Sequence, residues 1–162
     1  NQFLTAGRIG EAIARRLEED DGPEVVILLP LGTDGWLSQN VMDAMRERVL
    51  QRLRQADRHG RLKVYYPHAP DLNGKALNLH AKVMTVDDIW TSVGSTNFDS
   101  RSFRLNDEAN LNVLDAECAR GQSEAFEADK QRSKQVTLDG WRRRPWSEKL
   151  GDWAAGLLRL QL

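Results

Sequence analysis

The sequence contains a single cysteine, Cys118, so no disulfide bond can form within the chain and nothing in its cysteine content marks an oxidising compartment. It also lacks any apolar run that approaches the ~20 residues of a membrane-spanning helix, and no signal peptide is visible. The chain begins at Asn1 without a methionine. We therefore expect an upstream segment to be missing, together with any membrane anchor of the full-length protein.

A surplus of positive charge is also absent. The 23 Lys and Arg residues and the 24 Asp and Glu residues give a formal net charge of −1, and the pI is near 6.4. Proteins that bind nucleic acid non-specifically usually carry a basic surplus, so nucleic acid is the less favoured partner. A length of 162 residues, of which 40% are hydrophobic and 29% charged, fits one globular domain with a substantial core.

Hydrophobic periodicity and chain-breaking residues predict alternating helices and strands. The expected elements are a helix over 5–19 capped by Thr5, a strand over 24–30, a helix over 38–59 capped by Ser38, a strand over 63–66, a hairpin of strands over 77–86 and 89–95, a strand over 107–114 and a helix over 116–135. This order predicts an α/β fold in which a mixed β-sheet is flanked by helices on both faces. We expect one domain over 1–140.

Residues 141–162 differ in character from this domain. They hold three of the five tryptophans and a net charge of +3, from five basic and two acidic residues. Ser147 can cap a helix that runs to about Leu160. Two interpretations remain open for this Trp/Arg-rich helix. It can dock on the core, or it can lie at a membrane interface with tryptophan and arginine at the level of the lipid headgroups.

One spaced set of residues carries most of the chemical information. His80 and Lys82 are followed by Asp87 and then by Gly94-Ser95-Thr96-Asn97, all within eighteen residues. The set combines an imidazole, an ammonium group, a carboxylate and a Gly-Ser-x-Asn turn, and phosphodiester chemistry can use each of them. Strand alternation places His80 and Lys82 on the same face of the first hairpin strand.

The same alternation predicts how the hairpin is paired. If Asp87 and Asp88 are the two central turn residues, residue 84 opposes 91 and residue 80 opposes 95. In this register Ser95 lies beside His80, and Asn97 lies one step further along the same face.

The pattern H-x-K-x4-D-x6-G-S-x-N resembles the signature of the phospholipase D superfamily, and every fixed position is filled. The run over 97–110, the opening Asn1-Gln2-Phe3 and the late segment 141–146 resemble the second half of the cardiolipin synthase branch. The resemblance covers most of the chain and is strongest over 79–115. It implies that 1–140 is a phospholipase D-like catalytic half domain with one of the two motifs that the superfamily uses.

The resemblance also implies a mechanism. In the superfamily one histidine attacks phosphorus to give a phosphohistidine, a second histidine protonates the leaving alcohol, and a new alcohol or water displaces the enzyme, with no metal or cofactor. Carried over to this sequence, His80 is the nucleophile or the general acid. Lys82, Ser95 and Asn97 hold the phosphate oxygens.

The carboxylates are harder to assign. Glu108 is the candidate that orients His80, because it begins the expected strand after the Gly-Ser-x-Asn turn and lies in the family-like stretch 105–108. Asp107 is its rival, since alternation lets only one of the two face the site. Asp87 fills a fixed position of the pattern, but as a turn residue we expect it to support local structure.

The chain has one motif where the mechanism needs two. Neither His59 nor His68 is followed by lysine two positions later, and there is no internal repeat. The partner is therefore either a missing amino-terminal half or a second copy of the chain about a two-fold axis. We expect the isolated chain to be nearly inactive unless it dimerises.

The function that the resemblance implies is a phosphatidyltransferase acting on an anionic phospholipid. The alternatives are a phospholipase D or nuclease-type hydrolase that works as a homodimer, and an isolated half domain without activity. We expect the full-length protein to be associated with a bacterial cytoplasmic membrane.

Overall fold

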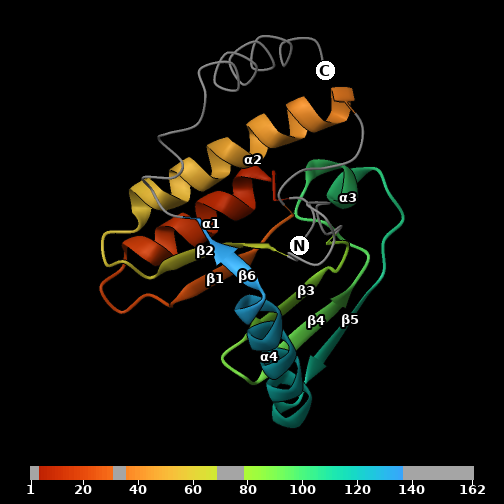
Figure 1. Cartoon of the computed structure of the whole chain (residues 1–162). Helices are drawn as coiled ribbons and strands as arrows, with labels where there is room; N and C mark the ends of the chain where they lie inside the picture. The colour runs from red at the N-terminus through yellow and green to blue at the C-terminus, as the bar shows by residue number, and fades with distance from the viewer. Residues whose placement is uncertain (1–3, 31–35, 69–78, 137–162) are drawn as a thin grey trace.

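The computed structural model describes residues 4–30, 36–68 and 79–136. Its elements are α1 (Gly7–Glu18), β1 (Val25–Leu28), α2 (Trp36–Ala56), β2 (Leu62–Pro67), β3 (Val83–Val86), β4 (Trp90–Gly94), α3 (Ser100–Arg104), β5 (Asn110–Leu114), α4 (Ala116–Gln131) and β6 (Ser133–Gln135) (Figure 1). The expected Trp/Arg-rich helix over 141–162 lies outside the described residues. So does the beginning of the expected strand over 77–86.

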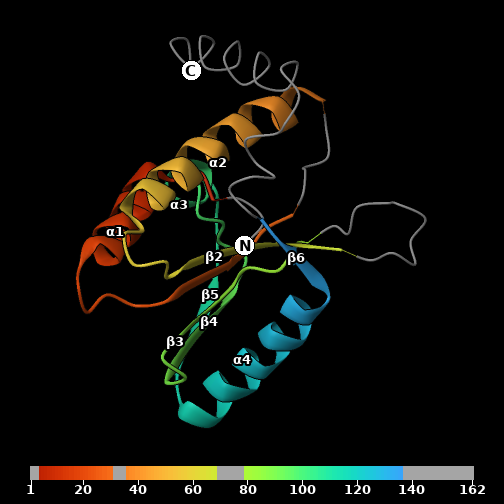
Figure 2. The same cartoon turned by 60° about the vertical axis from the view of Figure 1, so that its left-hand side comes forward.

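The strands form two small sheets. In the first, β1 pairs with β2 in parallel and β6 pairs with β2 in antiparallel fashion, so this sheet is mixed. The second has the order β3-β4-β5 and is antiparallel throughout. Figures 1 and 2 show α1 and α2 on one side of the strands and α4 on the other. The predicted mixed α/β class is confirmed, with the strands divided between two sheets instead of one.

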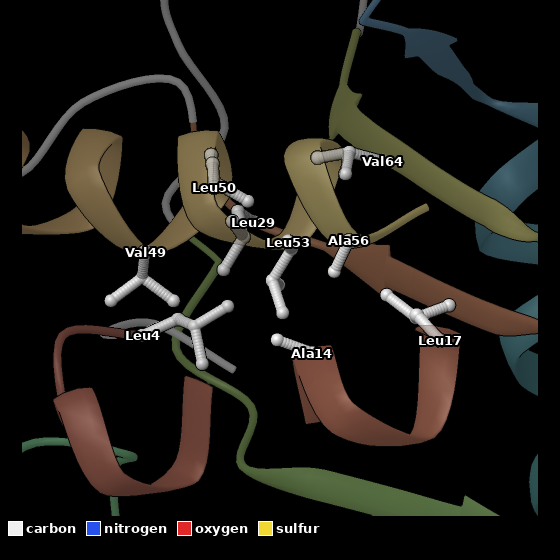
Figure 3. Close-up of a cluster of buried hydrophobic side chains, with 9 residues drawn as sticks. All are labelled: Leu4, Ala14, Leu17, Leu29, Val49, Leu50, Leu53, Ala56 and Val64. Atoms are coloured by element: carbon white, nitrogen blue, oxygen red, sulfur yellow. The ribbon is translucent and has the colours of Figure 1, made fainter. Parts of the chain in front are cut away.

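The main hydrophobic core lies between α1, α2 and the first sheet. Leu17 on α1 and Leu53 on α2 are fully buried, and Figure 3 shows side chains of the two helices pointing toward one another. The remaining buried members of this cluster are Leu4, Ala14, Leu29, Val49, Leu50, Ala56 and Val64. The helices approach closely at Gly10, where an added Cβ would lie 2.8 Å from Cγ1 of Val49. In the sequence, apolar residues at about four-residue spacing predict the inner face of each helix: Ile9, Ile13 and Leu17 in the first, and Val41, Met45, Val49 (or Arg48) and Leu53 in the second. The prediction is confirmed at Leu17, Val49 and Leu53, which are buried in this cluster.

The segment before α1 connects this core to the second sheet. Ala6, and not Thr5, is the N-cap of α1, and no side chain caps the helix. The backbone N–H groups of Thr5 and Ala6 both donate to the carbonyl oxygen of Phe98, at 2.9 and 2.8 Å. Leu4 forms an isolated parallel bridge with Phe98. The expected cap at Thr5 is therefore wrong. The helix begins one residue later than a Thr5 cap requires, and the backbone N–H of Thr5 is hydrogen bonded to the loop that follows β4.

Other expected boundaries also change. The helix expected over 38–59 spans Trp36–Ala56, so Ser38 lies inside this helix and the expected cap at Ser38 is wrong. The strand expected over 107–114 begins only at Asn110, and the strand expected over 77–86 is regular from Val83. The helix expected over 116–135 ends at Gln131, because 133–135 form β6 at the edge of the first sheet. Pairing with a distant strand outweighs helical propensity at this end.

The core makes a stability prediction. Leu53→Ala should lower the free energy of unfolding by about 2–5 kcal/mol, because it leaves a cavity at a site with no solvent exposure. Leu105→Ala is the matched control, since Leu105 is 79% exposed, and it should change stability by no more than about 0.5 kcal/mol. Urea denaturation measures both. Equal losses would contradict the prediction that burial of Leu53 stabilises the fold.

Candidate active site

The β3–β4 hairpin sets the geometry of the candidate site. Asp87 and Asp88 both adopt left-handed backbone conformations, with φ of 52° and 53°, and the N–H of Ile89 donates to the carbonyl of Val86 at 3.1 Å. These features fit a tight turn with two central residues, as expected. Ile89 lies between this turn and the first paired residue of β4, so Val86 pairs with Trp90.

The predicted register is therefore wrong by one residue. Met84 opposes Ser92, and not Thr91, and the N–H of Gly94 donates to the carbonyl of Lys82 at 3.1 Å. Continued along the chain, this register places position 96 opposite position 80. Ser95 does not lie directly opposite His80. Lys82 and Met84 line the same cavity, as expected for two positions on one face of a strand.

His80 and Lys82 lie just before β3 in different environments. His80 is exposed to solvent, whereas Lys82 is 7% exposed, and its ammonium group donates to the backbone carbonyl of His80 at 2.6 Å. Burial lowers the pKa of Lys82, and the nearby Glu108 carboxylate partly offsets this effect. The arrangement provides a desolvated cation at the backbone of an accessible histidine, and an anionic phosphate would neutralise that cation.

Gly94 is required by a close approach of two strands. A Cβ at Gly94 would lie 2.0 Å from Oδ1 of Asn110 and 2.3 Å from the carbonyl oxygen of Ala109. The Asn110 side chain occupies this space and accepts a hydrogen bond from the N–H of Thr96 at 3.2 Å. The N–H of Ser95 donates to the carbonyl of Ala109 at 3.0 Å. These contacts hold the turn over 95–97 against the start of β5.

Glu108 lies in the loop before β5 and gathers several donors. Its carboxylate accepts a hydrogen bond from the side chain of Asn106 at 3.2 Å, and the hydroxyl groups of Ser95 and Ser102 lie close enough to act on it. These hydroxyl groups, Ser95 first and then Ser102, lower the pKa of Glu108, and the positive charge of Lys82 acts in the same direction. Glu108 is therefore held as an anion near Lys82.

The other two acidic candidates are placed differently. Asp107 is exposed and precedes Glu108 in the same loop. Asp87 lies in the hairpin turn, at the opposite end of β3 from Lys82. The turn is attached to α4, because the hydroxyl of Ser123 donates to the Asp88 carboxylate at 2.6 Å. The position of Asp87 fits the predicted supporting role.

Asn97 and two residues that sequence reasoning missed complete the arrangement. The N–H of Asn97 donates to the hydroxyl of Ser102 at 3.2 Å, and Oδ1 of Asn97 is buried without a hydrogen-bond partner among the described residues. The N–H of Ser102 donates to Asp99 at 2.7 Å, so Asp99 caps α3. Asp99 and Ser102 are both buried. An aspartate three residues ahead of Ser102 is the N-cap signal that could have revealed this short helix.

A cavity of about 190 Å³ opens beside Lys82, on the face of the second sheet that carries Met84 and Ser92. Its walls combine apolar side chains, among them Trp90 and Phe103, with the amides of Asn110 and Asn112. Within the described ranges, no group of His, Cys, Asp or Glu side chains could hold a metal ion. No helix in these ranges is long and apolar enough to cross a membrane.

The class of the fold emerges from solved structures. The chain matches Nuc from Salmonella typhimurium, a phospholipase D family member, with a TM-score of 0.60 and 18% identity over 83% of this chain and 77% of that one. NucT from Helicobacter pylori gives the same TM-score and identity, with coverage of 83% and 78%. The fold is thus that of the phospholipase D family.

The sequence assigns the chain more narrowly. The family model described as cardiolipin synthase, PLD-like domain matches residues 3–130, so the chain belongs to this family of the phospholipase D superfamily. Cardiolipin synthase 1 of Staphylococcus epidermidis is 35% identical over 101 residues, covering 57% of this chain and 21% of that protein. The cardiolipin synthase of Clostridium perfringens is 28% identical over 143 residues, covering 86% and 26%. The predicted superfamily and branch are confirmed, and the chain spans about a fifth to a quarter of the length of these relatives.

The burial of Lys82 predicts a conflict between stability and chemistry. Lys82→Met should raise the free energy of unfolding by about 1 kcal/mol at pH 7, because it removes the desolvation of a buried cation. Burial lowers the pKa of Lys82 in the folded state. At a pH between this lowered pKa and the ordinary lysine pKa, the unfolded chain therefore binds more protons than the folded chain does, and stability increases with pH. The native protein therefore gains stability in that range, and the advantage of the variant should shrink.

Urea denaturation at pH 7 and at pH 9.5 measures this difference. Lys134→Met is the matched control, because Lys134 is exposed on β6 and its replacement should have little effect at either pH. A Lys82→Met variant that is less stable than the native chain at pH 7 would contradict the prediction.

Proposed function

We propose that the chain supplies one of the two catalytic motifs of a phosphatidyltransferase that acts on phospholipids through a phosphohistidine at His80. The observation that carries the proposal is the buried ammonium of Lys82 beside the anionic Glu108 and the accessible His80. Membership of the cardiolipin synthase, PLD-like domain family supports a phospholipid as the substrate.

In the first step a ring nitrogen of His80 attacks the phosphorus atom of the donor lipid. A P–N bond forms, the P–O bond to the leaving alcohol breaks, and a second imidazole gives that oxygen a proton. Lys82 and the amide of Asn97 compensate the negative charge on the non-bridging oxygens. In the second step the hydroxyl of an acceptor attacks the phosphohistidine, loses its proton to the second imidazole, and releases His80.

Glu108 has a supporting part in this scheme. A carboxylate that accepts a hydrogen bond from one imidazole nitrogen fixes the tautomer and leaves the other nitrogen free to attack phosphorus. Glu108 meets one condition for this task, since its pKa is lowered and it stays ionised. We propose Glu108, in preference to the exposed Asp107, as the residue that orients His80.

The second imidazole must come from a partner. The described part of the chain contains His59 and His68 besides His80, and His59 lies near the carboxylate of Asp20, at 3.6 Å, far along the chain from the motif. We propose that a second motif-bearing half, either upstream in the same protein or in a second copy, completes the site. A general acid contributes about 10² to 10⁴ in rate, so the chain alone should be nearly inactive.

The test uses the full-length protein with labelled phosphatidylglycerol, labelled glycerol and labelled single-stranded DNA in parallel. Transfer of the phosphatidyl group should be detected only with lipid, and a brief quench should trap label on the enzyme. His80→Asn should abolish the trapped label and lower turnover by at least about 10³-fold, because it removes the nucleophile. His68→Asn is the matched control, since His68 is exposed at the end of β2, and it should leave turnover unchanged.

Other outcomes redirect the assignment. Release of free alcohol without transfer would make the protein a hydrolase, and cleavage of DNA would make it a nuclease. Rapid turnover by a verified monomer of this chain would refute the need for a second half.

We propose that residues 141–162 assist recruitment to a membrane. Their net charge of +3 would contribute at most about 3 kcal/mol at an anionic surface, at about 1 kcal/mol per basic residue. Sedimentation with phosphatidylglycerol vesicles should therefore show up to about a hundredfold weaker binding after removal of 141–162. Equal binding by the two forms would leave a docking helix as the better interpretation.

A further inference from the structure

We propose that Ser102 is a positioning residue, whose hydroxyl joins the turn that carries Asn97 to the carboxylate of Glu108. This inference deepens the proposed function and rests on it for its catalytic meaning. Three segments lie around this hydroxyl: the loop after β4, the short helix α3 and the loop before β5.

The hydroxyl of Ser102 is placed to make both contacts. Its side chain is buried, with 6% of the residue exposed. The oxygen accepts the N–H of Asn97 at 3.2 Å. Because a hydroxyl group has one proton and two lone pairs, that proton remains available for the Glu108 carboxylate.

The backbone of Ser102 is also held by a hydrogen bond. Its N–H donates to Asp99 at 2.7 Å, and Asp99 is 3% exposed. The second oxygen of Asp99 lies 3.7 Å from the guanidinium of Arg101. The hydroxyl therefore lies on a helical turn with a buried N-cap, which limits how far it can move.

Ser95 makes an equivalent pair of contacts from the other side. Its oxygen accepts the N–H of Ala109 at 3.0 Å, and we propose that its proton is directed to Glu108, whose pKa it helps to lower. In this arrangement Ser95 has no second proton to offer a phosphate oxygen. We therefore assign Ser95 to the same positioning pair, and the expected role of phosphate donor falls to Lys82 and Asn97.

Few other groups act on Glu108. Lys82 is the charged group that does so within the described residues, and Asn106 is a neutral donor from the same loop. Removing the Ser102 hydroxyl leaves the carboxylate with fewer donors and leaves the N–H of Asn97 without its acceptor. The anion should then be less favoured, and the turn over 95–97 should be less well fixed.

The test compares Ser102→Ala and Ser102→Cys with Ser100→Ala. Ser100 begins the same helix but is exposed, so its replacement controls for changes in α3. Titration of the Glu108 side-chain carboxyl by ¹³C NMR in the whole chain should show an upward pKa shift in both Ser102 variants and none in Ser100→Ala. In the full-length enzyme, kcat should fall about ten- to a hundredfold with KM changed less than about twofold, and the acid limb of the pH profile should move upward.

The result that overturns the proposal is a Glu108 titration in Ser102→Cys that matches the native one. Ser102→Cys leaves no cavity, since a thiol is slightly larger than a hydroxyl, and it replaces a strong donor by a weak one, so it decides the question if Ser102→Ala does not fold. A full-length native protein that transfers no phosphatidyl group would end the proposed function. The NMR titration would still decide whether Ser102 holds Glu108.

Discussion

The Glu108 carboxylate is the acceptor on which three separate segments of the second half of the chain converge. Ser95 reaches it from the end of β4, Ser102 from α3 and Asn106 from its own loop. A neutral acceptor would not hold three donors as strongly, because hydrogen bonds to an ionised group are roughly twice as strong as those between neutral groups. The positive charge of Lys82 favours the same ionised state. The loop, the short helix and the buried lysine thus all lie close to one negative charge.

The hydrophobic core helps to hold the loop that leads to this site. α1 and α2 are closely packed on the first sheet, and the backbone just before α1 is hydrogen bonded to the carbonyl of Phe98, one residue after Asn97. Phe98 also packs against the core cluster. The loop that carries the candidate phosphate-binding residues is therefore attached at one end to the main hydrophobic core. Attachment of this kind lets a loop keep the fixed geometry that catalysis by preorganised groups requires.

Much of this arrangement could be predicted from sequence, and the failures have identifiable causes. The spacing from His80 to Asn97 indicated the chemistry, and the four-residue periodicity indicated the core at Leu17 and Leu53. The hairpin register could not be fixed, because Asp-Asp specifies a turn without saying whether Ile89 enters the ladder. Ser102 was missed because its role depends on groups five residues before it and six residues after it in the chain, at Asn97 and Glu108. The burial of Lys82 depends on how the second sheet packs, which alternation alone does not reveal.

The bridge between Leu4 and Phe98 has a topological consequence. The chain enters this part of the molecule beside the candidate phosphate-binding turn, so any polypeptide joined ahead of Leu4 is tethered there. A short flexible tether gives an effective local concentration on the order of millimolar. Linker length at this end would then govern how often an attached module meets the turn, whatever its intrinsic affinity.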